Sequence, residues 1–179
     1  MAKDAKSAFC EDSRVKFPTL MHLMGMGFKY VSLKGLKTKY VEAPKTEFDP
    51  LTNILTDYFI DAYCTLNPKA EKKDAEDMLV KIQKSLQNDD LGRQFYNEIL
   101  LNTGEKIIDL SSPVNFYKNN TFQVATEMTC GSKDSDNYRP DITIFVNGLP
   151  LAFIEVKKEN NHKGIQEECI KSALVVIEM

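Results

Sequence analysis

The sequence predicts an α/β protein in which helices come first and a sheet follows. Apolar residues recur at helical spacing over about 49–103, and short runs rich in β-branched and aromatic residues follow Gly104. The 179 residues are 42% hydrophobic and 27% charged, which is enough for one buried core. We therefore expect a single domain, 1–179, with helices flanking the sheet and a helical insertion at about 49–103.

The first segment favours a helix over 11–24, which Pro18 would bend or restart and which Gly25 and Gly27 would end. The lysine-rich segment 28–46 is typical of an extended or irregular connection.

Three helices are expected in the insertion. The first begins at Asp49, whose carboxylate can cap a helix start, and Pro50 suits its first position. The third begins at Asp89 or Asp90 and ends before Gly104. The apolar faces of the three comprise Leu51, Ile54, Leu55, Tyr58, Ala62 and Leu66; Ala75, Met78, Leu79, Ile82 and Leu86; and Leu91, Phe95 and Ile99.

Five short strands are expected after the helices. They are 106–110, 115–117, 122–128, 142–146 and 151–156. Asn147 and Gly148 mark a tight turn, and the polar segment 131–138 is a loop between strands. The tail from Gly164 favours a helix that closes against the sheet.

Composition limits the location and the metal chemistry. No stretch approaches the roughly 20 apolar residues of a membrane helix, and the first residues lack the apolar run of a secretory signal, so we expect a cytoplasmic protein without a membrane partner. The four cysteines form no CxxC pair and the two histidines have no zinc-like spacing. Free thiols are expected, and any catalytic metal should be a hard cation bound by oxygen.

The net charge of −3 argues against a free-standing, high-affinity DNA binder, because neutralised phosphates supply most non-specific affinity. A basic stretch interleaved with aromatic residues fits DNA contact and a solvated loop equally well. It contains Lys29, Lys34, Lys37, Lys39 and Lys45 among Phe28, Tyr30 and Tyr40.

The most informative segment joins a Pro-Asp pair ending at Asp141 to Glu155, Val156 and Lys157 at the end of an apolar strand. Strand alternation puts Glu155 and Lys157 on one face, while Val156 turns into the core and leaves its carbonyl at the rim. Two carboxylates about 4 Å apart repel by about 4 kcal/mol at a surface-like dielectric, so a cation between them is favoured.

Mg²⁺ fits this donor set, since it takes one or two carboxylates with carbonyl, water and phosphate oxygens. A bound cation can polarise a phosphate and acidify a water, which Lys157 can orient or deprotonate. The structural alternative is an ordinary ion pair of Glu155 with Lys157, with Asp141 capping a turn.

The strand register decides whether the two acids meet. A two-residue hairpin turn pairs Val146 with Leu149 and puts Asp141 opposite Ile154, on the wrong face. A three-residue loop, or a bulge near Asp141, would put Asp141 opposite Glu155 instead. We predict one of these two arrangements.

Four separate segments carry a resemblance to a known family. RPDITIFVNGLPLAFIEVKK resembles the PD-(D/E)xK nuclease segment of type I restriction enzyme R subunits. EDSRVKFPTLMHLMGMGFKYVSL, DPLTNILTDYF, and NDDLGRQFYNEIL with the nearby IIDL are similar to the N-terminal region of that family, in the same order. Together they span most of the chain up to about Gly164.

The resemblance implies a restriction-endonuclease-like mixed sheet, Mg²⁺-dependent cleavage of double-stranded DNA, and a complex with methylase and specificity subunits. It makes Asp141 and Glu155 metal ligands beside the Val156 carbonyl, and Lys157 the catalytic lysine. In the wider superfamily a glutamate of the first helix often reaches the metal, and Glu11 matches that position. Equally, Glu11 can be a first-turn acid that the helix dipole favours.

The chain departs from the family in two places. No GxxxxGK[ST] phosphate loop occurs, so the ATP-driven motor of a full R subunit is absent and the chain is expected to be a fragment. The family's glutamine motif has no convincing match after the lysine, and Gln166 receives no role. The alternative functions are a standalone repair-type nuclease of the same fold and a non-enzymatic docking domain.

Overall fold

The computed structural model describes residues 15–37, 42–87, 90, 92–101, 104–129 and 139–156. The predicted loop 131–138, the tail after Gly164, Glu11 and Lys157 lie outside these residues.

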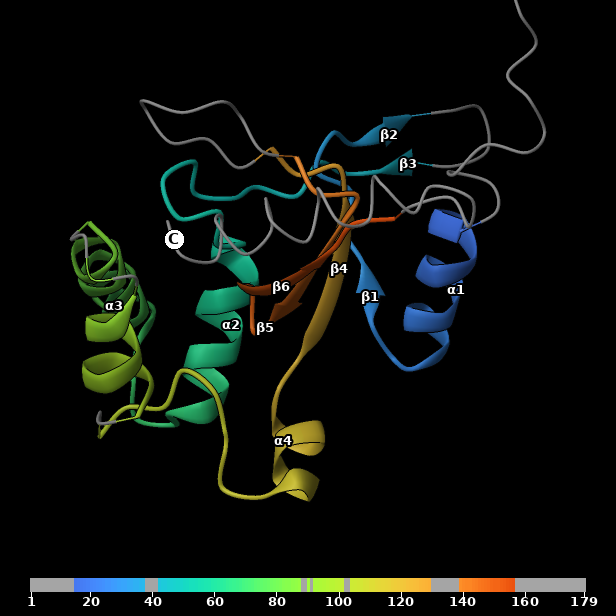
Figure 1. The fold of residues 1–179 in the computed structure, drawn as a ribbon. Helices are drawn as coiled ribbons and strands as arrows, with labels where there is room; N and C mark the ends of the chain where they lie inside the picture. The colour runs from blue at the N-terminus through green and yellow to red at the C-terminus, as the bar shows by residue number, and fades with distance from the viewer. Residues whose placement is uncertain are drawn as a thin grey trace, which may run out of the picture.

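A four-stranded mixed sheet forms the centre of the described chain (Figure 1). Its strands, in spatial order, are β1 (Lys29–Tyr30), β4 (Phe122–Thr126), β5 (Ile142–Val146) and β6 (Leu149–Ile154). β1 runs parallel to β4, and the other neighbours are antiparallel. A separate two-stranded sheet pairs β2 (Leu36–Lys37) with β3 (Glu42–Ala43).

The described residues contain five helices. They are α1 (Phe17–Gly25), α2 (Thr56–Leu66), α3 (Lys72–Ser85), the π-helix η2 (Phe95–Leu100) and α4 (Pro113–Asn119). All of these helices except α1 fall between β1 and β4, so a long, mostly helical crossover connects these two parallel strands. The predicted mixed α/β architecture, with a helical insertion before the main strands, is confirmed.

Helices cover both faces of the sheet, as the two sides of Figure 1 show. Leu20 of α1 packs with Val124 and Ile142, whereas Leu55, just before α2, packs with Ala125 and Phe145. Because neighbouring strand residues point to opposite faces, α1 and the start of α2 lie on opposite sides of β4.

The largest buried cluster joins the helical insertion to the hairpin of β5 and β6. Phe59 and Tyr63 of α2 and Met78 and Ile82 of α3 are at most 1% exposed and pack in one cluster with Leu149. Each such side chain contributes roughly 1.5–3 kcal/mol when fully buried. The predicted apolar stripe of α3 is confirmed as a packing face that fixes the insertion on the sheet.

The predicted helix start at Asp49 is wrong. The Asp49 carboxylate accepts hydrogen bonds from Leu51 N and Thr52 N, but it caps a single turn. Asn53 then has a φ of 58°, in the left-handed region, which stops helical continuation. α2 begins at Thr56, after the Leu55 amide has donated to the carbonyl oxygen of Gly148 at 2.9 Å.

Two predicted strands are also wrong. Segment 106–110 is irregular, and 115–117 lies inside α4. Ser112 accepts a hydrogen bond from Asn115 N, and Pro113 occupies the first helical turn, so a serine cap followed by proline outweighs the β propensity of the aromatic residues. The strand predicted at 142–146 is confirmed as β5. Those predicted at 122–128 and 151–156 overlap β4 and β6, but β4 ends at Thr126, and β6 begins at Leu149 and ends at Ile154.

Pro18 lies in the first turn of α1, directly after the π-helical Val15 and Lys16, and the part of the predicted helix before Val15 lies outside the described residues. None of the helices in the described ranges is both long enough and apolar enough to cross a membrane.

Candidate functional site

The hairpin of β5 and β6 sets the geometry of the candidate site. Asn147 and Gly148 have φ values of 53° and 77°, and this two-residue turn pairs Val146 with Leu149. Phe145 then pairs with Pro150, but the next residue of β5, Ile144, pairs with Ala152.

Leu151 is therefore an extra residue in β6, and the ladder contains a β-bulge. The bulge shifts the register, so that Ile142 pairs with Ile154. One step further along the two strands, Asp141 comes opposite Glu155. The predicted register is confirmed through a bulge rather than a three-residue loop, and the bulge lies three residues from Asp141 instead of beside it.

Asp141 is tied to the backbone of the opposite strand end. The amide of Val156 donates to Asp141 Oδ2 at 2.9 Å, and Lys16 Nζ lies 3.6 Å from Asp141 Oδ1. Glu155 is half-buried, and the Val156 side chain, only 4% exposed, packs in the core with Leu20. The inward direction of Val156 is confirmed.

Glu127, which sequence reasoning missed, adjoins this pair. Its amide donates to the Asp141 carbonyl oxygen at 3.1 Å, and its carboxylate accepts a hydrogen bond from Lys16 Nζ at 2.9 Å. The Lys16 hydrogen bond and positive charge hold the pKa of Glu127 below its ordinary value, helped by Arg139 and Lys34. Lys16 and Glu127 are 111 positions apart and share no motif, so only the fold brings them together.

Three of the five predicted site residues lie in the described chain: Asp141, Glu155 and Val156. Their carboxylate and carbonyl groups are hard oxygen donors, the type that Mg²⁺ takes in small numbers together with water. Within the described ranges, no group of three or more His, Cys, Asp or Glu side chains could hold a metal ion.

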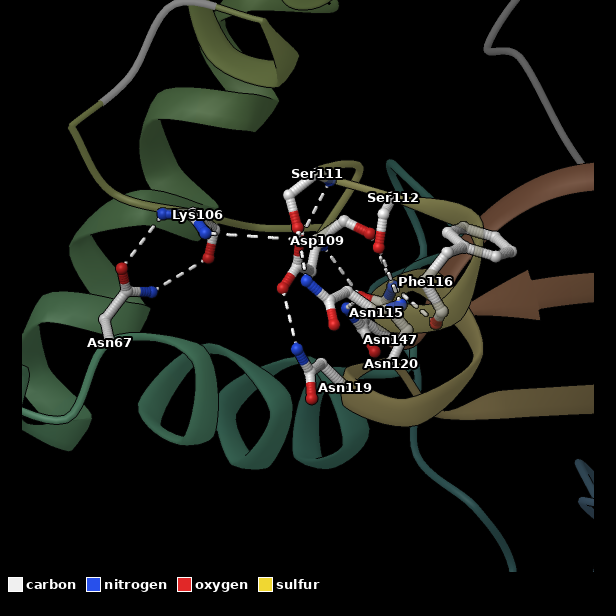
Figure 2. Close-up of polar contacts among 10 residues, drawn as sticks. All are labelled: Asn67, Lys106, Asp109, Ser111, Ser112, Asn115, Phe116, Asn119, Asn120 and Asn147. Carbon is white, nitrogen blue, oxygen red and sulfur yellow. Dashed lines mark hydrogen bonds and ion pairs between the residues drawn. The ribbon is translucent and has the colours of Figure 1, made fainter.

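A buried polar network holds the hairpin turn in place (Figure 2). Asn147 is fully buried; its Nδ2 donates to the Ile107 carbonyl oxygen and to Asn120 Oδ1, and its Oδ1 accepts from Thr121 N at 2.8 Å. These bonds join the turn to the segment before α4 and to the start of β4. Because every polar atom of the Asn147 side chain has a partner, the network is a rigid support for the turn.

Asp109 organises the other half of this network, as Figure 2 shows. Its carboxylate accepts hydrogen bonds from Ser111 Oγ and N and from Asn119 Nδ2, which lower its pKa to about 2. Its amide donates to Asn120 Oδ1 at 2.9 Å. Asp109 is therefore an ionised structural residue that orients the loop in front of α4.

Comparison with protein families decides the kinship of the chain. The model of the type I restriction enzyme R protein N terminus matches residues 9–173. The chain belongs to this family. The R-protein match covers all five predicted site residues.

Two relatives come from Methanocaldococcus jannaschii. The "Putative type I restriction enzyme MjaIXP endonuclease subunit" is 27% identical over 175 residues, 88% of this chain and 16% of the relative. The "Putative type I restriction enzyme MjaVIIIP endonuclease subunit" is 44% identical over 57 residues, 30% of this chain and 5% of the relative. The chain thus spans a small part of the length of these R-protein relatives. No solved structure matches it.

Proposed function

We propose that this R-protein N terminus cleaves double-stranded DNA by Mg²⁺-dependent phosphodiester hydrolysis, as the nuclease domain of a type I restriction system. The observation that carries the proposal is the β-bulge, because it shifts the register of β5 and β6 so that Asp141 comes opposite Glu155. Membership of the R-protein family and the endonuclease names of both relatives support the same reaction.

Each site residue has a distinct task in this proposal. Asp141 and Glu155 hold Mg²⁺ together with the Val156 carbonyl, and the Val156 amide keeps Asp141 turned towards the end of β6. Lys157 orients the attacking water and offsets charge on the phosphate. Glu11 is proposed to reach the metal from the first helix. Bound Mg²⁺ supplies Lewis-acid polarisation of the phosphate and a more acidic water.

The chain acts within a larger assembly in this proposal. With a net charge of −3 it lacks the positive charge of an autonomous DNA binder, so the ATP-driven motor and the methylase and specificity subunits bring DNA to it. The chain folds as one domain, and the complex works in the cytoplasm without a membrane partner.

Cleavage is tested in a restriction complex reconstituted with motor, methylase and specificity subunits. Asp141→Asn and Lys157→Ala should each lower DNA cleavage by at least about a hundredfold, because the first removes a proposed metal ligand and the second the positive charge beside the reacting phosphate. ATP hydrolysis and DNA binding should be unchanged. Nicking and cutting of circular DNA, with and without Mg²⁺, measure the effect.

Asp61→Asn is the matched control, since Asp61 is an exposed acid of α2 and its variant should cut like the wild type. Continued cutting by Asp141→Asn and Lys157→Ala would remove the nuclease assignment and favour a docking domain. Efficient cutting of linear or branched DNA by the chain alone would favour a standalone nuclease.

A further inference from the structure

Three cations surround the carboxylate of Glu127. Lys16 Nζ lies 2.9 Å from Oε1, and Lys34 Nζ and Arg139 Nη2 lie 3.6 and 3.7 Å from Oε2. They come from three segments: the start of α1, the loop after β1 and the approach to β5. Asp141 adjoins the same group of side chains, since its Oδ1 lies 3.6 Å from Lys16 Nζ.

The geometry is that of an oxyanion site. An arginine and two lysines around one pair of oxygens is a common way to bind phosphate, and a carboxylate and a phosphodiester each carry one negative charge. Lys34 and Arg139 have side chains 74% and 54% exposed, so a ligand can reach them, whereas Lys16 is 12% exposed and fixed in place.

The backbone aims Glu127 into this site. Its φ of 55° lies in the left-handed region, which is uncommon for a residue with a side chain. Its amide is bound to the carbonyl oxygen of Asp141. The carboxylate is therefore held next to the candidate nuclease residues, where DNA would pass.

We propose that Lys16, Lys34 and Arg139 form a binding site for a phosphate of the DNA backbone, and that Glu127 occupies this site until DNA displaces it. That the ligand is DNA rests on the proposed function. The choice of the three cationic residues and the displacement of Glu127 do not depend on cleavage. Glu127 then acts as an internal competitor that weakens DNA binding by the chain on its own.

The test measures binding of a short, labelled DNA duplex to the full chain without divalent cations, over a series of NaCl concentrations. Lys34→Ala and Arg139→Ala should each weaken binding several-fold and reduce the slope of log K against log salt by about 0.9, the loss of one phosphate contact. Glu127→Gln should tighten binding several-fold, because the competing charge is gone.

An exposed ion pair elsewhere provides matched controls. Lys72 Nζ lies 3.8 Å from Glu76 Oε1 on α3, so Lys72→Ala and Glu76→Gln make the same charge changes outside the cluster. Both should change affinity less than the paired test variants do. Unchanged or weaker binding by Glu127→Gln, effects equal to those of the controls, or no binding by any variant at low salt would overturn the proposal.

Circular dichroism shows whether each variant is folded. If Glu127→Gln fails to fold, Lys34→Ala and Arg139→Ala test the proposal instead. Both side chains are exposed, so their removal should leave the protein folded. Because binding is measured without divalent cations, a failed cleavage experiment would not affect this result. A failed binding experiment would likewise leave the proposed cleavage unaffected.

Discussion

Single polar side chains hold the hairpin that carries the candidate site. Asn147 combines a φ of 53° with complete burial, and its side-chain amide bonds to three residues in two other segments of chain. Asparagine tolerates this backbone conformation and supplies both donors and acceptors.

Asn147→Ala should lower the free energy of unfolding by about 2–4 kcal/mol, because the Ile107 carbonyl oxygen and the Thr121 amide lose their buried partner. Urea denaturation measures the change. The exposed Asn97→Ala should shift stability by no more than about 0.5 kcal/mol. Equal effects of the two substitutions would show that the network contributes nothing.

The lowered pKa of Asp109 predicts that the stability of the fold depends on pH. Hydrogen bonds from Ser111 and Asn119 lower its pKa to about 2, against roughly 3.9 in an unfolded chain. A carboxyl with a lowered pKa stabilises the fold fully above the unfolded value, and this contribution is lost as the pH falls towards 2.

The stability gap between the wild type and Asp109→Asn should therefore shrink between about pH 4 and pH 2 in urea titrations. A gap that stays constant over this range would contradict the assigned pKa. Acids elsewhere are common to both proteins and cancel in the comparison.

The residue scale also shows what the sequence could predict. Strand alternation and hairpin register are local rules, so the sequence could predict the observed pairing of Ile142 with Ile154, the residues next to Asp141 and Glu155. Lys16 and Glu127 were not found, since their contact depends on how α1 packs against β4. Lys157 and Glu11 stay predictions.

At the scale of elements, the hairpin turn docks on the start of α2. Gly148 has a φ of 77°, and a Cβ there would lie 2.6 Å from the Leu55 carbonyl oxygen and 2.9 Å from the Phe59 amide nitrogen. Only glycine lets the two backbones approach so closely.

Gly148→Ala should lower the free energy of unfolding by about 2–4 kcal/mol, because the backbone of α2 cannot move aside cheaply. Thermal or urea unfolding checks this. Gly104→Ala is the matched control, since nothing lies within 4 Å of its added Cβ. A neutral Gly148→Ala would mean that turn and helix are not packed as described.

Irregular backbone differed from place to place in how far the sequence could predict it. The bulge at Leu151 follows from a conflict that is visible in the sequence, between a two-residue turn and two acids that must share a face. The irregular course of 106–110 does not, because its apolar residues Ile107 and Ile108 are buried by packing against the insertion rather than by a β ladder.

At the scale of the whole molecule, the sheet and its helical insertion hold the start of β5 and the end of β6 together as a fixed edge. The mixed sheet was predictable from a family resemblance, and β1 was not, because two residues give no usable periodicity. The proposed chemistry depends on one property of this edge: Asp141 and Glu155 must share a cation.

A crystal of the protein soaked in Mn²⁺, examined by anomalous scattering, tests this property most directly. The account predicts a peak about 2.0–2.4 Å from carboxylate oxygens of both Asp141 and Glu155, with the Val156 carbonyl beside it. Asp141→Asn should remove the peak. Two acids on opposite faces of the hairpin, with no metal between them in the wild type, would contradict the account.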